Sequence, residues 1–447
     1  MKKRISLILL CFCVLALGFS QDKFTVQNKK HSDKIKFKLI NNLIVIPVNI
    51  NGVTLSFLLD TGVSKPIIFN FLNISDSLKI KNTEKIYLRG LGEGEPVEAL
   101  RSKGNIIRIG DAIKLKQDLN VVYDVNLNFA PRLGIPVHGI IGFDLFKDLV
   151  VEINYTKKIL KLTEPPSFKY KNCNKCERLS LEFYKNKPYI NGFVEFDNKK
   201  IAVKLLIDSG GSDALWLFED ETTGIKSSDK HFNDFLGHGL GGSVYGKRSK
   251  IEKFYLNNFK FKTVNVAYPD SVFIHHAKKF RNRSGSMGGN ILKRFNIIVD
   301  YQKASITLKK NSNFNEEFSY NKSGIELAHD GFRIVREVDD SSLRRNKFSE
   351  NTEGTNPNSS TILINPAYKL SLKPAYAIVE LRENSPAFNA GLKRGDVILR
   401  INSTAAYKFS LQKLTRLFYG DEGKHMRLKV DRDGRIITVS FTLKNPF

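Results

Sequence analysis

The chain has 447 residues, which is too long for one ordinary core and predicts roughly two to four domains. Hydrophobic residues make up 41% of the sequence and aromatic residues 11%, which supports packed globular domains throughout. The net charge of +26 is spread along the chain without a nucleic-acid-binding motif. We therefore expect no nucleic-acid partner, although a basic surface suits anionic membrane or cell-wall material.

The N-terminus is typical of an export signal. The basic residues 2–4 precede an apolar stretch, 5–17, and Ser20 is a small residue at a suitable cleavage point. An uncleaved anchor is the alternative, but the apolar stretch is shorter than the roughly 20 residues that span a bilayer. We expect residues 1–20 to be a signal peptide, and the mature protein to reach the periplasm, the cell envelope or the extracellular space.

Strand-like runs joined by tight turns begin soon after this signal. Residues 43–50 and 53–59 are apolar runs separated by an Asn-Gly turn, which is a strong hairpin signal. The second run leads directly into Asp60, Thr61 and Gly62. An aspartate therefore enters a loop from the end of a predicted strand, where catalytic groups commonly lie.

The same arrangement recurs in the second half of the chain. Residues 189–196 and 201–207 are strand-like, are separated by an Asp-Asn turn, and lead into Asp208, Ser209 and Gly210. A single Asp-Thr/Ser-Gly triplet is a weak signal, because these residues are common in turns. Two copies after matching hairpins indicate a duplicated domain.

Further landmarks repeat downstream of each aspartate at nearly the same offset. Residues 142–155 are similar to residues 289–301. Each half also has a glycine-leucine-glycine stretch. These stretches are Gly90, Leu91 and Gly92 in the first half and Gly239, Leu240 and Gly241 in the second. We interpret them as hairpin flaps that close over a substrate. An ordinary surface hairpin is the alternative, and for the second stretch the two interpretations are evenly balanced.

The chemistry of two facing carboxylates makes these triplets functional candidates. Two carboxylates at close range cannot both ionise, so they share a proton and their apparent pKa values move apart. The pair then supplies an acid and a base at once. We expect the hydroxyls of Thr61 and Ser209 to link the two loops by hydrogen bonds. Gly62 and Gly210 would let each backbone approach its partner loop.

Residues 36–310 resemble the aspartic peptidases of the pepsin and retropepsin clan. Residues 58–62 and 206–210 are similar to the two active-site loops of that clan, and residues 140–142 resemble its apolar-apolar-glycine element, with a weaker counterpart at 287–289. The resemblance implies a mainly β fold with a two-lobed pair of pepsin/retropepsin-like β-barrels. It also implies a catalytic pair, Asp60 and Asp208, that acts on polypeptide substrates with no cofactor, no metal and no acyl-enzyme.

The duplication sets the expected organisation of this region. We expect an N-terminal lobe at 21–165, an interlobe linker at 166–177 and a C-terminal lobe at 178–312. One chain then supplies both aspartates, so a monomer is expected rather than a retropepsin-like homodimer. Val63 and Gly211 stand where a small hydroxyl residue often follows the motif in pepsin-like enzymes. Without that donor the carboxylates should be less acidic, which predicts a pH optimum milder than that of a digestive enzyme.

Cys173 and Cys176 are the cysteines outside the expected signal peptide. A zinc site would need two more ligands at suitable spacing, and none is apparent. A local disulfide in an oxidising compartment is the preferred interpretation, and a redox-active role is the minor alternative.

The C-terminal region resembles a bacterial-type PDZ domain. Residues 385–402 contain a short Ser-Pro-Ala helix start, a Gly-Asp turn and an apolar strand, in that order. We expect connecting strands and a polar linker at 313–360 and an α+β PDZ domain at 361–447. PDZ domains bind an extended peptide as an added strand, often by its C-terminal carboxylate. The candidate groove residues are Ala377, Ile378, Val379, Leu411 and Leu414. A domain that only packs on the peptidase is the alternative, with Leu411 and Leu414 as plain core.

Two functional hypotheses follow. The first is an active aspartic endopeptidase that recruits substrate through a PDZ domain. The second is a non-catalytic envelope protein that binds peptides in the PDZ groove and keeps the β-lobes as a scaffold. Both carboxylates and both adjoining hydroxyls are present, which favours the enzyme. The sequence does not name the substrate or the PDZ ligand.

Overall fold

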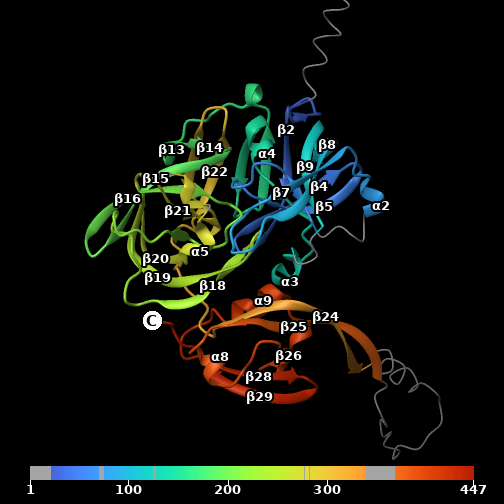
Figure 1. The fold of residues 1–447 in the computed structure, drawn as a ribbon, viewed down its shortest axis with the longest axis vertical. Helices are drawn as coiled ribbons and strands as arrows, with labels where there is room; N and C mark the ends of the chain where they lie inside the picture. Colours follow the sequence, from blue (N-terminus) through green and yellow to red (C-terminus); the bar gives the residue numbers. More distant parts are fainter. Residues whose placement is uncertain (1–21, 70–74, 124–126, 276, 281, 339–367) are drawn as a thin grey trace, which may run out of the picture. The chain divides into compact units, whose positions relative to one another are not determined.

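The computed structural model describes residues 22–447 except 70–74, 124–126, 276, 281 and 339–367. Strands hold 53% of the residues and helices 10%, which confirms the mainly β prediction. The chain forms two compact units (Figure 1). The first runs to Asn321 and includes Asn445–Phe447, and the second comprises Lys322–Lys444. The expected signal peptide lies outside the described residues. Among those described, no helix has the length and apolar character needed to cross a bilayer.

The first half of unit 1 is built on a nine-stranded sheet, with the order β1-β9-β6-β10-β5-β4-β8-β7 and β3 paired to β4. Its strands are β1 (Thr25–Val26), β3 (Lys38–Ile40), β4 (Leu43–Ile50), β5 (Val53–Leu59), β6 (Ile67–Ile68), β7 (Thr83–Leu88), β8 (Val97–Ile109), β9 (Ala112–Val122) and β10 (Gly139–Ile141). The turn between β4 and β5 has positive φ angles at Asn51 and Gly52, as expected for the Asn-Gly hairpin.

The second half repeats this plan in an eight-stranded sheet of order β14-β15-β16-β21-β17-β20-β19-β18. Its strands are β14 (Glu182–Tyr184), β15 (Lys187–Phe196), β16 (Lys199–Ile207), β17 (Leu215–Leu217), β18 (Phe232–Gly239), β19 (Gly242–Leu256), β20 (Phe259–Pro269) and β21 (Arg283–Met287). Asp197 and Asn198 form the predicted turn between β15 and β16, both with positive φ. In Figure 1 the two halves are coloured blue to cyan and green to yellow.

A six-stranded sheet joins the two halves, in the order β13-β23-β22-β11-β12-β2. Its strands are β2 (Ser32–Lys36), β11 (Val150–Asn154), β12 (Ile159–Thr163), β13 (Cys176–Ser180), β22 (Phe295–Asp300) and β23 (Ser305–Lys310). The central pair, β11 and β22, comes from the two repeated segments and runs antiparallel. One continuous hydrophobic core therefore includes buried residues of both halves, such as Phe57 and Phe254.

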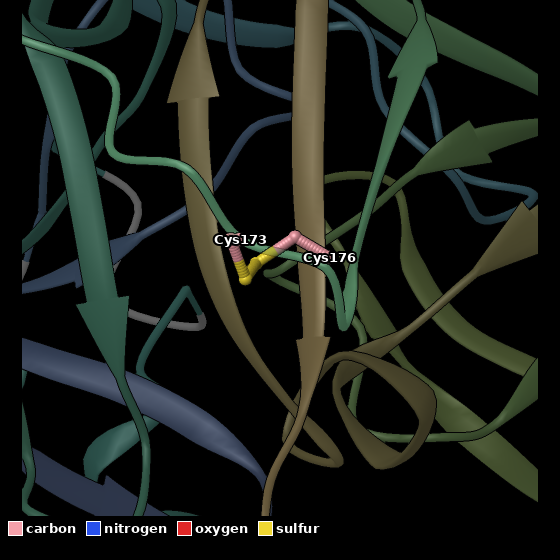
Figure 2. Close-up of a disulfide and its surroundings, with 2 residues drawn as sticks. All are labelled: Cys173 and Cys176. Atoms are coloured by element: carbon pink, nitrogen blue, oxygen red, sulfur yellow. A yellow bond between two sulfur atoms is a disulfide. The ribbon is translucent and has the colours of Figure 1, made fainter.

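Helices in unit 1 are short and lie in the connections between strands. They are α2 (Ser75–Leu78), α3 (Ala130–Leu133), α4 (Phe143–Asp148), α5 (Ser271–Ile274), α6 (Gly289–Leu292), η2 (Pro165–Ser167) and η3 (Ala277–Lys279). After η2 the chain crosses between the halves, and Cys173 and Cys176 form a disulfide there (Figure 2). The bridge closes a tight turn that leads into β13, in which the amide of Cys176, the first residue of that strand, donates to the Cys173 carbonyl.

Unit 2 has a six-stranded sheet of order β24-β25-β26-β28-β29, with β27 paired to β26. Its elements are β24 (Ile325–Val338), β25 (Tyr368–Leu381), α8 (Pro386–Asn389), β26 (Val397–Ile401), β27 (Thr404–Ala405), η4 (Ala406–Lys408), α9 (Leu411–Leu417), β28 (His425–Arg432) and β29 (Arg435–Thr442). The Ser385 side chain caps α8, as the Ser-Pro-Ala motif indicates.

The limits of unit 2 differ from the expected PDZ limits of 361–447. β24 was assigned to the connecting segment, but it pairs with β25 along its length, and Ile325 and Leu327 are buried in the core of unit 2. That pairing spans a long gap in the sequence, so local pattern does not reveal it. At the other end, Phe447 belongs to unit 1, where its ring lies 5.4 Å from Phe232 and 5.8 Å from Tyr320.

Candidate active site

Both aspartates occupy the same kind of position in the fold. Asp60 follows the last residue of β5, and its amide donates to the carbonyl of Ile141 on the parallel strand β10 at 2.9 Å. Asp208 follows β16, and its amide donates to the carbonyl of Met287 on the parallel strand β21 at 3.0 Å. A later strand of the same half thus inserts beside each aspartate and fixes the direction of its loop.

Thr61 and Ser209 bind the two loops to each other. The Thr61 amide donates to Ser209 Oγ at 3.1 Å, and the Ser209 amide donates to Thr61 Oγ1 at 3.0 Å. Each hydroxyl then donates to the strand end of the opposite half: Thr61 Oγ1 to the Ile207 carbonyl at 2.6 Å and Ser209 Oγ to the Leu59 carbonyl at 2.8 Å. Both side chains are 3% exposed, so four buried hydrogen bonds hold one loop against the other.

The glycines bring the two carboxylates face to face. A Cβ on Gly210 would lie 2.4 Å from Asp60 Cγ, and a Cβ on Gly62 would lie 3.7 Å from Asp208 Oδ1. Each carboxylate therefore lies against the glycine of the other loop. Within its own loop, Asp60 Oδ1 accepts from the Gly62 amide at 2.6 Å, and Asp208 Oδ1 accepts from the Gly210 amide at 3.1 Å.

Burial changes the protonation of this pair. Burial, and then the nearby charge of Asp208, raise the pKa of Asp60 to about 7 against the hydrogen bond from the Gly62 amide. Burial also raises the pKa of Asp208, but Arg283 and then Lys187 act in the opposite direction. A carboxylate pair of this kind holds a proton well above the pH at which an isolated aspartate ionises.

The two glycine-leucine-glycine stretches meet at their tips. The Gly94 amide donates to the Gly241 carbonyl at 2.8 Å, and the Gly241 amide donates to the Leu91 carbonyl at 2.9 Å. A Cβ on Gly92 would lie 2.2 Å from the Gly241 carbonyl oxygen, and one on Gly239 would lie 2.3 Å from the Leu91 carbonyl oxygen. Only glycines permit this close approach of two backbones.

The flap leucines cross over to the opposite half. Leu240, from the second flap, packs on a first-half cluster that includes Leu43 and Leu58. Leu91, from the first flap, packs on a second-half cluster that includes Leu236 and Val244. The Gly90 site is equally tight, because a Cβ there would lie 2.6 Å from the Leu240 Cβ. The second stretch, residues 239–241, is therefore packed against the tip of the first flap in this structure.

A pocket of about 490 Å³ lies beside the first flap tip rather than at the aspartates. Its lining combines charged side chains of the flap with residues in and after α5: Arg89, Glu93, Glu95, Ser271, Val272, His275 and Lys278, together with three flap glycines. The flap is fixed to this region by the Gly92 amide, which donates to the Phe273 carbonyl at 3.4 Å.

Sequence reasoning missed two cations that act electrostatically on the dyad. Lys187 is the first residue of β15, and Arg283 is the first residue of β21. Both side chains are partly buried, and both lower the pKa of Asp208. Their equivalence to apolar residues of the first half emerges only when the two halves are compared in three dimensions.

The PDZ groove candidates have a different setting from the one expected. Ala377 pairs with Ala328 of β24 and with Val397 of β26, so β25 is an interior strand. The Ile378 amide and carbonyl are both hydrogen-bonded, to Asp396 and Gly395, and the Val379 carbonyl accepts from Arg394. These backbone groups are therefore already used and do not offer an edge to a peptide. Leu411 and Leu414 lie in the core of unit 2, at 4% and 0% exposure.

Comparison with known proteins agrees with the two classes that the fold indicates. Residues 46–145 match the family model of an aspartyl protease, and residues 378–432 match that of a PDZ domain. The first match contains Asp60 and the first flap, whereas Asp208 lies outside it. The chain thus combines an aspartyl protease domain with a C-terminal PDZ domain.

A curated relative carries a different description. A Lactococcus lactis subsp. lactis (strain IL1403) protein named "Putative zinc metalloprotease LL2128" is 37% identical over 68 residues. The match covers 15% of this chain and 15% of that protein. In the described ranges of the present chain, no group of three or more His, Cys, Asp or Glu side chains is arranged to hold a metal ion.

Proposed function

We propose that the chain is an aspartic endopeptidase in which Asp60 and Asp208 activate a water molecule to hydrolyse peptide bonds. The observation that carries this proposal is the reciprocal hydrogen bonding of Thr61 and Ser209, which holds two aspartate loops from one chain against each other. An Asp-Thr/Ser-Gly turn used only as structure would not need a second copy bound to it through buried hydroxyls.

The chemistry follows from one shared proton. The ionised carboxylate takes a proton from the water, and the protonated carboxylate donates to the carbonyl oxygen of the scissile peptide. The water oxygen bonds to the carbonyl carbon and gives a tetrahedral diol. Collapse of the diol breaks the C–N bond: one carboxyl gives its proton to the leaving amine, and the other takes a proton from a diol hydroxyl, which becomes the carbonyl of the new carboxyl product. The carboxylates return to their starting state, and no side chain becomes bonded to the substrate.

The pKa of Asp60 sets the expected pH range. The reaction needs one protonated carboxylate, so activity should fall as the pH rises through about 7, where Asp60 ionises. This agrees with the milder pH optimum expected from Val63 and Gly211. A maximum below about pH 3 would contradict it.

The closed flaps indicate the form of the substrate. A chain that reaches the dyad must pass beneath tips that are hydrogen-bonded to each other at Leu91, Gly94 and Gly241. An extended, unfolded segment fits beneath two opening hairpins, whereas a folded domain does not. We therefore propose unfolded or extended polypeptides as substrates.

The remaining parts of the proposal concern recruitment and location. We propose that the PDZ unit binds polypeptide segments for the peptidase, at a surface other than Ala377–Val379. We also propose that residues 1–20 direct the chain out of the cytoplasm, and that one chain acts alone because it holds both aspartates. Metal dependence is not carried over from the Lactococcus protein, because the shared region is a small part of either chain.

The test is cleavage of an unfolded protein by residues 21–447 between about pH 3 and about pH 8. Asp60→Asn and Asp208→Asn should each lower kcat/KM by about 10³-fold or more. Asp197→Asn changes an exposed hairpin turn by the same chemistry and should leave kcat/KM unchanged. A chelator should have no effect. Cleavage that survives both dyad substitutions would rule out the proposal. No cleavage by the unsubstituted chain at any pH would favour the peptide-binding scaffold.

A further inference from the structure

The duplicated halves allow each position near the dyad to be compared with its counterpart. In the first half, Ile40 and Leu43 close the two-residue turn between β3 and β4. In the second half, Tyr184 and Lys187 close the equivalent turn between β14 and β15. Both turns use two residues with positive φ. Lys187 therefore occupies the position that buried Leu43 occupies in the first half.

These turns lie next to the aspartate loops of the opposite halves. Asn42 Nδ2 donates to the Ser212 carbonyl at 2.9 Å, four residues after Asp208. In the other direction, Ser64, four residues after Asp60, donates from its Oγ to the Lys185 carbonyl at 3.0 Å. Each turn thus contacts the aspartate loop of the other half. The turn of the first half is closed by Leu43, and the turn of the second half is closed by Lys187.

A second pair shows the same exchange. The carbonyl of His138, next to β10, accepts from the Phe69 amide at 2.9 Å, and the carbonyl of Ser284, in β21, accepts from the Phe218 amide at 2.8 Å. The residues just before these equivalent positions are Val137 and Arg283. Val137 is fully buried in an apolar cluster.

Arg283 is held in place by several contacts. Its side chain donates to Ser286 Oγ at 2.8 Å and to the Gly285 carbonyl at 3.1 Å, and its guanidinium lies 5.1 Å from the Phe218 ring centre. Two apolar positions of the first half are therefore cations in the second half.

We propose that Lys187 and Arg283 are positioning residues that make Asp208 the carboxylate that ionises first and leave the shared proton on Asp60. The reason is Coulombic. Two symmetric halves would give two equivalent carboxylates, but both of these cations come from the second half, where Arg283 begins β21, the strand that lies beside Asp208. This inference rests on the proposed peptidase function and assigns its base to Asp208 and its acid to Asp60.

The charged groups around the dyad act unequally on its two carboxylates. Arg283 and Lys187 oppose the effect of burial on the pKa of Asp208, whereas the charge of Asp208 raises the pKa of Asp60 and Lys187 lowers it. Tyr301 also interacts with Asp60, and its pKa is raised by burial and by that carboxylate, so its phenol stays neutral.

The two cations also interact with their own surroundings. The pKa of Lys187 is lowered by burial and then by Arg283, while both dyad carboxylates raise it. Lys185, from the same turn, adds a smaller repulsion. The pKa of Arg283 is lowered by burial against the attraction of Tyr189 and Asp208. Asp208 is thus the carboxylate that interacts with both cations, whereas Asp60 interacts with Lys187.

The first readout is titration of the dyad by NMR of ¹³Cγ-labelled aspartate, with assignments from Asp60→Asn and Asp208→Asn. Asp208 should ionise at the lower pH in the unsubstituted chain. Lys187→Met should move both transitions upward, and Arg283→Met should move mainly that of Asp208, each by roughly one pH unit. Ionisation of Asp60 first, or no movement in either variant, would overturn the inference.

The second readout is the pH profile of kcat/KM. Lys187→Met should shift the acid limb to higher pH, Lys187→Arg should restore it, and a purely structural role would lower activity without moving the limb. Lys185→Asn removes a neighbouring charge at a turn position with positive φ and should leave the limb in place. If Asp208 titrates first but no variant or parent cleaves, the proposed function fails while the charge assignment stands.

Discussion

The two halves of unit 1 share a backbone plan but differ in the side chains that face the dyad. Both end a strand at an aspartate, both insert a parallel strand beside it, and both bind the opposite loop through one hydroxyl. Where the first half has Leu43 and Val137, however, the second has Lys187 and Arg283. The backbone geometry that places two carboxylates together has been kept on both sides, while the charges around them have become unequal.

The two halves also differ in the protonation of their aspartates, and the largest effect we expect is on the free energy of unfolding. The pKa of Asp60 is raised from 3.8 to about 7, so the folded state binds a proton more tightly than the unfolded state. This contributes stability that is complete below about pH 4 and is lost as the pH rises through about 7. Asp60→Asn removes that loss and should stabilise unit 1 at pH 8 relative to the parent by at most about 4 kcal/mol.

Trp216 is the single tryptophan of the chain and lies in unit 1, so its fluorescence follows the urea unfolding of that unit. The difference between Asp60→Asn and the parent should shrink as the pH is lowered towards 4. Asp197→Asn serves as the matched control, because it lies in an exposed turn. A difference that is the same at pH 4 and pH 8 would contradict the raised pKa.

Substitutions of Thr61 and Ser209 test whether the two hydroxyls contribute equally to the free energy of unfolding. Ser209→Ala leaves the Thr61 amide and the Leu59 carbonyl without partners, and Thr61→Val does the same to the Ser209 amide and the Ile207 carbonyl. Each variant should lose about 2–3 kcal/mol of unfolding free energy, measured by Trp216 fluorescence in urea. Unequal losses, by more than about 1 kcal/mol, would show that one half carries more of the linkage.

Local chemistry explains which parts of this site the sequence could predict. The turns at Asn51-Gly52 and Asp197-Asn198 depend on residues that accept positive φ, and each aspartate follows the second strand of its hairpin. The exchange of Leu91 and Leu240 between halves, by contrast, joins residues far apart in the chain.

The PDZ domain itself was predicted, but the setting of the candidate groove residues could not be read from local pattern. Residues 377–379 have the alternation of a strand, but their pattern does not tell an interior strand from an edge. The pairing of β24 with β25 decided that question, and it links segments separated by a long polar stretch. Likewise, Lys187 and Arg283 look like ordinary surface cations until the repeat is aligned in three dimensions.

Two glycines at the flap tips, Gly92 and Gly242, allow contact between the flaps to be separated from backbone strain. Gly92 and Gly242 both have strongly positive φ, at 120° and 106°. A Cβ on Gly92 would meet the Gly241 carbonyl, whereas one on Gly242 has open space around it. Gly92→Ala should lower kcat/KM by about 10²-fold through misplaced flaps, and Gly242→Ala, with only backbone strain, should lower it much less. Equal losses would mean that backbone strain, rather than contact between the tips, limits closure.

The smallest expected effect concerns the base of the second flap. Phe232 begins β18, and its ring lies 5.3 Å from Tyr320 and 5.4 Å from Phe447, so the end of the chain packs where this flap starts. Phe447→Ala removes two aromatic contacts from a side chain that is 41% exposed, and should cost about 1 kcal/mol in the unfolding of unit 1. Phe388→Ala is a matched control, because Phe388 is 43% exposed and belongs to unit 2. If both variants shift the Trp216 transition equally, the contact with Phe232 is not what stabilises the flap base. If only Phe447→Ala does, the second flap has an anchor supplied by residues that follow the PDZ domain, and the two flaps differ in how firmly they are held as well as in the charges beneath them.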